Sequence, residues 1–168
     1  MTSPLFMRDV TLTLRLSNPG TGLRTEFNCD LHTAEIVPTA GDEVSYSTLC
    51  PSGSYSSRGK TTYALHVVAA QRWDATGLAA FLWDNDGQLA DFQYQAHGAT
   101  VPPSTTAPGM TGQVTLIAGN YGGEVDTYPE LEVEMPCTSK PTKISTAFPA
   151  LDAAEEPAAT EPAATVAA

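Results

Sequence analysis

The sequence predicts a mainly β protein: a β-sandwich or barrel-like domain with one flanking α-helix, long loops and a disordered C-terminal tail. Three observations support this class. Most ordered stretches alternate apolar and polar residues with a period of two, which is the pattern of a strand with one buried face. A single stretch, residues 77–83, changes to the helical spacing of three and four. Glycine, proline and short polar residues separate these stretches, as turns require.

Residues 61–71 form the predicted central strand. Tyr63, Leu65, Val67 and Ala69 occupy alternate positions, so that one face is apolar and the other mixed. We expect this strand to be half or wholly buried. A tryptophan follows at the corner after the strand, where packing against the helix is its expected role.

The predicted helix follows Asp74, whose carboxylate is suited to capping free N–H groups. Leu78, Phe81 and Leu82 fall at i, i+3 and i+4, which gives a helix of about three turns one apolar face. It ends near the Asn-Asp-Gly turn that follows. The chain then returns to a period of two over residues 89–96. The expected anchors of the core and the helix are Trp73, Leu78, Phe81, Leu82, Phe92 and Tyr94.

Further strands are predicted on both sides of this unit. The runs 10–16 and 26–32 alternate, and the apolar phase of the second shifts by one residue at 33–37. That shift indicates a β-bulge or a strand that leaves one sheet for another. Residues 113–118 and 124–128 read as a hairpin across a glycine-rich turn.

Two long segments are predicted to be loops. Residues 39–60 are rich in Gly, Ser, Asp and Pro and contain at most a short strand at 44–49, and a loop of this length is usually functional. Residues 98–109 hold too many prolines for regular structure. After residue 149 the sequence is reduced to mainly Ala, Pro, Glu and Thr, with too little bulky apolar surface to fold alone. We expect one β domain over 1–149 and a low-complexity tail over 150–168.

Composition and charge exclude several classes of function. The chain has 168 residues, 42% of them hydrophobic, which is enough for one good core. Its 19 Asp and Glu outnumber its 8 Lys and Arg, and the formal net charge is −11. The basic residues are scattered, so the surface is expected to repel nucleic acid rather than bind it. We expect neither a membrane span nor a standard export signal.

Residue types that carry chemistry are present but not grouped. The three histidines fall in different elements, without the spacing of a catalytic triad or a metal site. The three cysteines are odd in number and widely spaced, which favours buried reduced thiols over a disulfide framework. We therefore expect no catalytic residue, no metal, no cofactor and no enzymatic activity. The histidines are His32, His66 and His97, and the cysteines are Cys29, Cys50 and Cys137.

The acidic residues are the exception. Five carboxylates fall within eleven residues, and no basic residue lies among them. Three of the five share one face of a predicted strand over 130–135, whose other face is apolar. Such a row repels itself, so it is either a solvated face or a surface built to be acidic. The five residues are Glu124, Asp126, Glu130, Glu132 and Glu134.

The order of these elements resembles the major tail (tail tube) proteins of long-tailed phages, particularly those that infect actinobacteria. The resemblance covers about residues 10–143. The segments that carry it are the strand ending in Gln71-Arg72-Trp73, the helix 77–85, the strand around Phe92-Gln93-Tyr94, the Pro/Thr loop into 112–114, the turn 122–125 and the segment 133–141.

The resemblance implies a subunit that forms six-membered rings, which stack into a tube through which the genome leaves the capsid. It implies as partners other copies of the chain and the tail tip or initiator, tape measure and tail terminator proteins, with DNA passing through unbound. It implies no membrane, and a place in the virion tail after assembly in the host cytoplasm. An acidic lumen suits this role, because a negative wall does not hold phosphates. The five acidic residues are expected to form it, and residues 39–60 would suit contacts between rings.

The residues leave one alternative open, a non-enzymatic β-sandwich module that decorates a virion or binds carbohydrate. Such a binder shows exposed aromatic side chains on loops, and Tyr46, Tyr55 and Tyr121 are the loop candidates. An enzyme would show a constellation of catalytic groups, which the sequence does not contain.

Overall fold

The computed structural model describes residues 10–18, 24–27, 29–47, 53–97 and 101–148. Within them it confirms the predicted class, since strands dominate and one helix accompanies them. The predicted tail, 150–168, lies outside the described residues. The elements are β1 (Thr11–Leu16), β2 (Arg24–Glu26), β3 (Leu31–Thr39), β4 (Glu43–Ser47), β5 (Ser54–Arg58), β6 (Thr62–Ala70), α1 (Leu78–Asp84), β7 (Leu89–Gln95), β8 (Gly109–Thr115), β9 (Glu130–Pro136) and β10 (Thr142–Ile144).

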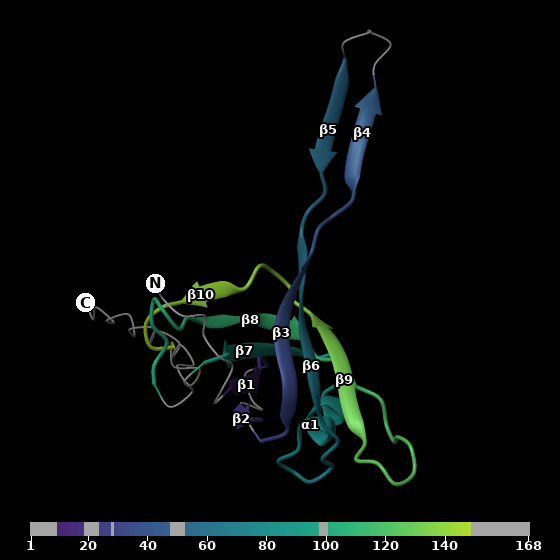
Figure 1. Cartoon of the computed structure of the whole chain (residues 1–168), viewed down its shortest axis with the longest axis vertical. Helices are drawn as coiled ribbons and strands as arrows, with labels where there is room; N and C mark the ends of the chain where they lie inside the picture. The colour runs from purple at the N-terminus through teal and green to yellow at the C-terminus, as the bar shows by residue number, and fades with distance from the viewer. Residues whose placement is uncertain (1–9, 19–23, 28, 48–52, 98–100, 149–168) are drawn as a thin grey trace, which may run out of the picture.

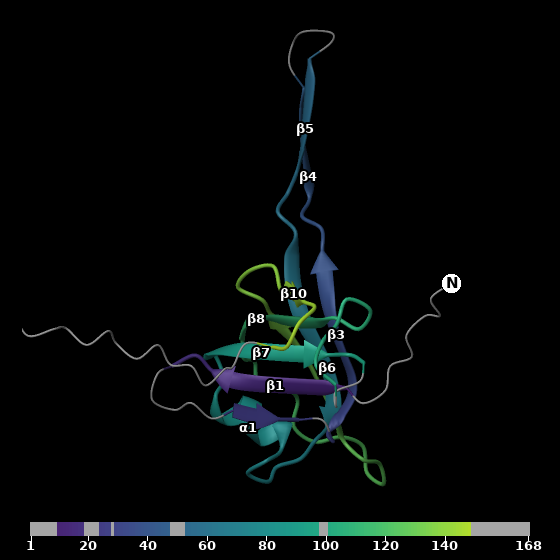
Figure 2. The same ribbon diagram turned by 90° about the vertical axis from the view of Figure 1, so that its left-hand side faces the viewer.

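Two antiparallel sheets enclose one hydrophobic core (Figure 1). The larger sheet has the order β10-β8-β7-β1-β2, and the smaller sheet has the order β3-β6-β9. The strands of the two sheets cross at a large angle, which is the orthogonal one of the two common ways of packing sheets face to face. Helix α1 lies at one end of the smaller sheet, and β4 and β5 project beyond its other end (Figure 2).

The larger sheet is built around the pairing of β1 with β7. Leu14 lies opposite Phe92 in this pairing, and both side chains are fully buried in the core. Gly112 on β8 lies opposite Phe92, and a Cβ at this glycine would come within 2.9 Å of the phenylalanine ring. Gln93 and Gln95 are buried as well. β7 is therefore covered on both faces, although the sequence predicted a polar side for the glutamines.

The chain changes sheets between β2 and β3. The register of β3 against β6 shifts between Leu31 and Thr33, so the predicted change of phase marks a bulge. The change of sheet comes earlier, between Glu26 and Leu31, and it divides the strand that was predicted over 26–32. The hydroxyl of Tyr94 on β7 donates a hydrogen bond to the carbonyl oxygen of Ala34 on β3 and ties the sheets together. β3 continues through Pro38, where the sequence predicted its end, because an edge strand tolerates proline.

Two described strands within residues 39–60 pair with each other and project from the sandwich, where the sequence predicted a surface loop with at most a short strand at 44–49. β4 and β5 pair as an arm that continues the line of β3 and β6 (Figures 1 and 2). Tyr46 and Tyr55 pair across the arm and are 68% and 69% exposed. The base is narrow, because a Cβ on Gly41 would lie 2.6 Å from the carbonyl carbon of Gly59. The possible short strand at 44–49 overlaps β4, whereas β5 escaped prediction because it covers no core and shows no apolar alternation.

Helix α1 is shorter than predicted, with seven residues against about three turns of helix. Its N-cap is Gly77, which has no side chain to offer. Asp74 does not cap the helix; it accepts hydrogen bonds from the backbone N–H and the hydroxyl of Thr76 at 2.9 and 2.6 Å. The N–H of Leu78 points instead to the buried carboxylate of Asp30, at 3.4 Å.

Arg72 fixes the corner between β6 and α1. Its Nη1 lies 2.7 Å from Oδ1 of Asp30, and its Nε lies 3.0 Å from Oδ2 of Asp74. The hydrogen bonds to Asp74 and the charge of Asp30 raise the pKa of Arg72. Hydrogen bonds from Arg72 and Thr76 hold the pKa of Asp74 well below its usual range. Charge-assisted hydrogen bonds thus connect this corner to the turn before β3.

The hairpin predicted over 113–128 does not form. β8 ends at Thr115 and pairs with β7 and β10, and residues 116–129 contain no strand. This loop turns at Gly122 and Asp126, whose φ angles are 88° and 67°. It carries the chain from the larger sheet to β9 in the smaller one. The short strand β10, at the C-terminal end of the described residues, was not predicted.

Candidate functional site

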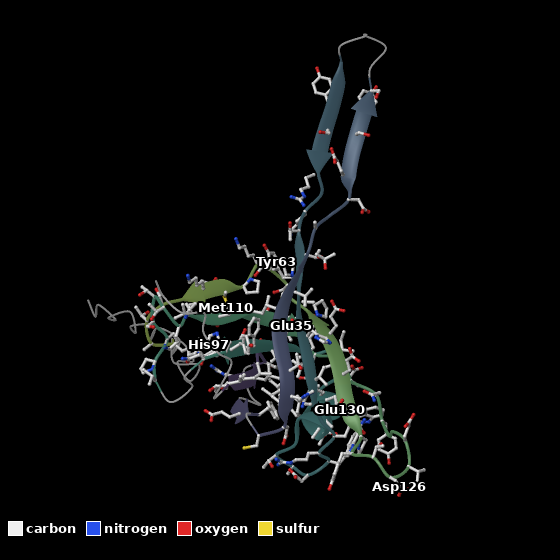
Figure 3. All side chains as sticks on the ribbon, in the orientation of Figure 1. Glu35, Tyr63, His97, Met110, Asp126 and Glu130 are labelled. Atoms are coloured by element: carbon white, nitrogen blue, oxygen red, sulfur yellow. The ribbon has the colours of Figure 1, made fainter. Side chains whose placement is uncertain are left out.

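The outward face of the smaller sheet is acidic. In β9 buried and exposed residues alternate strictly, so Leu131, Val133 and Met135 enter the core. The glutamates between them therefore point outward and are exposed, as the period of a strand requires. β6 runs beside β9, and β3 runs on the far side of β6 (Figure 3). We call this surface the acidic face; its charged residues are Glu35, His66, Glu130, Glu132 and Glu134.

A histidine bridges all three strands of the acidic face. His66 lies opposite Glu35 on β3 and opposite Glu134 on β9. Its Nδ1 is 3.2 Å from Oε1 of Glu35, and its Nε2 is 3.2 Å from Oε1 of Glu132, the diagonal neighbour on β9. The histidine side chain is 22% exposed, whereas the two glutamates are 58% and 74% exposed.

The geometry of this bridge favours the charged imidazolium. A neutral imidazole carries one N–H, so one of two facing carboxylates would meet a lone pair, whereas an imidazolium donates to both. The hydrogen bond to Glu132, and then that to Glu35, raise the pKa of His66 above its ordinary value of 6.5, against the opposing effect of burial. The bridge joins β3, β6 and β9, and it offsets part of the negative charge of the face.

The predicted acidic residues separate into two groups. Glu130, Glu132 and Glu134 share the acidic face, where His32 lies 3.9 Å from Glu130 in an exposed and therefore weak contact. Glu124 and Asp126 are exposed on the loop that precedes β9. Figure 3 places Asp126 beyond the end of the sheet, away from the row.

The predicted anchors of the core and the helix also divide. Leu78, Leu82 and Phe92 are fully buried, and Tyr94 is 7% exposed. Phe81 is partly buried, and its ring packs on that of Phe27 at a centroid distance of 5.3 Å.

The prediction for Trp73 was wrong, because its side chain is 42% exposed. It packs edge to face on Trp83 at 5.8 Å and on Tyr121 at 5.1 Å between ring centroids. Trp83 and Tyr121 are 52% and 76% exposed. We call these three residues the aromatic cluster. It joins the β6–α1 corner, the helix and the loop before β9 at the surface.

The remaining candidate residues are not brought together. Cys29 is exposed, contrary to the expected burial, and Cys137 is half-buried with its pKa raised by burial; Cys50 lies outside the described residues. Among the residues that the structure describes, no group of three or more His, Cys, Asp or Glu is arranged to hold a metal ion. In the same part of the chain no helix is long and apolar enough to cross a membrane.

Sequence reasoning missed Glu35 and His66 as members of the acidic face. Each belongs to a strand that was predicted, but neither lies near the glutamate row in the sequence. Only the register of β3, β6 and β9 places them beside it, and pairing register is not visible in a single sequence. The one available signal was the outward phase of His66 in the alternating pattern of its strand.

No protein-family model and no curated protein matches the sequence. Among solved structures, the chain is similar to the SPP1 tail tube, determined by solid-state NMR and cryo-EM, with a TM-score of 0.61 and 16% identity over 86% of this chain and 81% of that one. It is also similar to the tail of an empty GTA particle refined with C6 symmetry, with a TM-score of 0.52 and 16% identity over 80% and 94% of the two chains. A third match is the 6-fold symmetrised baseplate of the anti-feeding prophage, with a TM-score of 0.54 and 8% identity over 86% and 98%. The chain therefore has the fold found in tail tubes.

Proposed function

We propose that the chain is a structural virion protein, the subunit of the tail tube of a long-tailed phage. The observation that carries the proposal is the fold, which the chain shares with the SPP1 tail tube over 86% of its length. The resemblance in sequence described above supports a phage of actinobacteria. In this function the subunits form hexameric rings that stack into a conduit for genome ejection.

The acidic face is the surface best suited to line the conduit. Its three glutamates on β9 and Glu35 on β3 are exposed, and the described part of the face carries no lysine or arginine. Passing DNA presents a dense row of phosphates, which such a wall repels and does not retain. Glu124 and Asp126, at the end of the sheet, would extend the negative surface toward the mouth of each ring.

The arm formed by β4 and β5 is suited to contacts between rings. It projects from the sandwich along the direction of the smaller sheet (Figure 2). None of its described side chains belongs to the core. An exposed hairpin of this kind gains stability when it meets a neighbour. Other partners would be the tail tip or initiator, tape measure and tail terminator proteins, which begin, measure and end the stack.

Electron microscopy of the purified protein tests the proposal directly. Negatively stained samples at rising protein concentration, with and without a tail-tip initiator, should show rings of six and then tubes. Particles that remain monomeric in mass and shape under both conditions would refute a tube subunit.

A second function has one observation in its favour, the exposed aromatic cluster. Trp73, Trp83 and Tyr121 form the kind of surface on which sugar rings stack, as expected of a carbohydrate-binding or virion-decorating module. Titration of the protein with host cell-wall oligosaccharides, followed by tryptophan fluorescence, distinguishes the two functions. Saturable binding by a protein that stays monomeric would favour the module.

A further inference from the structure

Exposed aromatic side chains gather at opposite ends of the molecule. The aromatic cluster lies at the end that carries α1, while Tyr46 and Tyr55 lie on the arm at the other end (Figures 1 and 2). Two different surfaces at opposite ends are what a head-to-tail stack requires, because each interface joins the top of one subunit to the bottom of the next.

Hydrogen bonds fix the loop that carries Tyr121, one member of the aromatic cluster. Tyr121 stands on a loop whose neighbour Gly122 exchanges two hydrogen bonds with the side chain of Gln71, at 3.0 and 3.1 Å. On the other side of Tyr121 in the chain, the side-chain amide of Asn120 donates a hydrogen bond to the carbonyl oxygen of Glu130 at 2.9 Å. Fixed aromatic side chains lose little conformational entropy on binding, which is why tryptophan and tyrosine are frequent at the centres of interfaces.

Residues 44–57 of the arm can approach this cluster without bringing a charged side chain of their own. Acidic residues lie next to the cluster in the sequence: Asp74 follows Trp73, Asp84 follows Trp83, and Glu124 comes three positions after Tyr121. Arg72, which precedes Trp73, is paired with Asp30 and Asp74. The chain as a whole has a net charge of −11, so two copies repel one another over most of their surfaces. Residues 44–57 contain no charged side chain, and two tyrosines pair across the described strands of this segment.

We propose that the aromatic cluster is the docking site for the arm of a second copy of this chain, with Tyr46 and Tyr55 packing against Trp73, Trp83 and Tyr121. This inference rests on the proposed tube function and names the surface that receives the arm. Aromatic contacts between the two surfaces would bury apolar area that is exposed to water on each separate copy, which favours docking.

Both tryptophans of the chain belong to the cluster, so tryptophan fluorescence reports on this surface alone. In assembled wild-type tubes, emission should shift to shorter wavelength relative to the unassembled protein, and quenching by acrylamide should fall several-fold. In a Tyr46→Ser/Tyr55→Ser variant the emission and the quenching should stay at the values of the unassembled protein. Val101→Ser, which removes an exposed apolar side chain from the segment between β7 and β8, should behave as wild type.

Two outcomes overturn the inference while leaving the tube function intact. Wild-type tubes with unshifted emission would mean that the cluster remains open to solvent. A shift that persists in the tyrosine variant would mean that another part of the neighbouring copy covers the cluster. Failure of the wild-type chain to assemble at all would refute the proposed function, and this inference with it.

Discussion

Trp73 and Phe92 show how position decides the contribution of an aromatic side chain. Trp73→Ala removes an exposed ring with two edge-to-face contacts and should lower the free energy of unfolding by about 1 kcal/mol. Phe92→Ala empties a fully buried site in the core and should cost about 3–5 kcal/mol. Urea denaturation of both variants checks the order. Equal losses would place Trp73 in the core after all.

His66 predicts a pH dependence of stability. Its pKa is raised in the folded state, so the native protein holds the proton more tightly than the unfolded chain does. The contribution of the bridge is therefore complete below the ordinary pKa of 6.5 and is lost as the pH rises through the raised native value. The free energy of unfolding of the wild type should decline over this range more than that of His66→Gln.

The control is His32→Gln, which removes an exposed histidine from the same sheet and should keep the wild-type decline. NMR titration of the His66 ring gives the native pKa directly. A value at or below 6.5 would contradict the charged bridge.

At the scale of one strand, the glutamate row of β9 leads to a prediction about the rate at which DNA is ejected through the proposed tube. Glu130→Lys/Glu132→Lys/Glu134→Lys leaves the buried side of β9 untouched, so particles should still form. The face would then attract phosphates, and ejection should slow strongly at low salt and recover as salt is added.

Ejection rates measured against ionic strength test this expectation. Glu134→Lys and Asp84→Lys make the same change of charge on the acidic face and on α1, and only the first should slow ejection. If the ejection rates of wild-type and triple-lysine particles depend on ionic strength in the same way, the glutamate row does not face the lumen.

Because the arm lies outside the core, we expect that removing it abolishes the stacking of rings but leaves the folding of the sandwich intact. Replacing residues 43–58 by Asn-Gly, a sequence suited to a tight hairpin turn, removes β4 and β5, none of whose described side chains belongs to the core. The thermal midpoint should change little, while rings should no longer stack. Calorimetry together with electron microscopy checks both parts, and normal tubes from the shortened chain would exclude the arm from ring contacts.

The sequence predicted the elements that have a core face and missed those that do not. The strands around Leu14, Leu65, Phe92 and Val133 alternate because one side of each is buried. β4 was predicted only as a possible short strand at 44–49, and β5 and β10 were missed, because exposed or very short strands carry little such period. The glutamate row was visible because it lies on one strand, whereas the contribution of His66 depends on pairing between strands.

For the whole molecule, composition predicts that residues 150–168 are dispensable for folding and tube formation. A chain that ends after Pro149 should have the wild-type thermal midpoint and should enter tubes at the wild-type rate. Circular dichroism and electron microscopy measure these two properties. A truncated chain that fails to fold or to enter particles would overturn the prediction.

The smaller sheet has two open edges, because within the described residues β3 and β9 each pair in this sheet with β6 alone. Open edges invite uncontrolled aggregation. Alternate residues of β9 are glutamates, so two β9 edges that meet bring like charges together, and the encounter is unfavourable until salt screens it. If the chain is a tube subunit as proposed, this repulsion would keep free subunits apart until salt or a nucleating partner overcomes it.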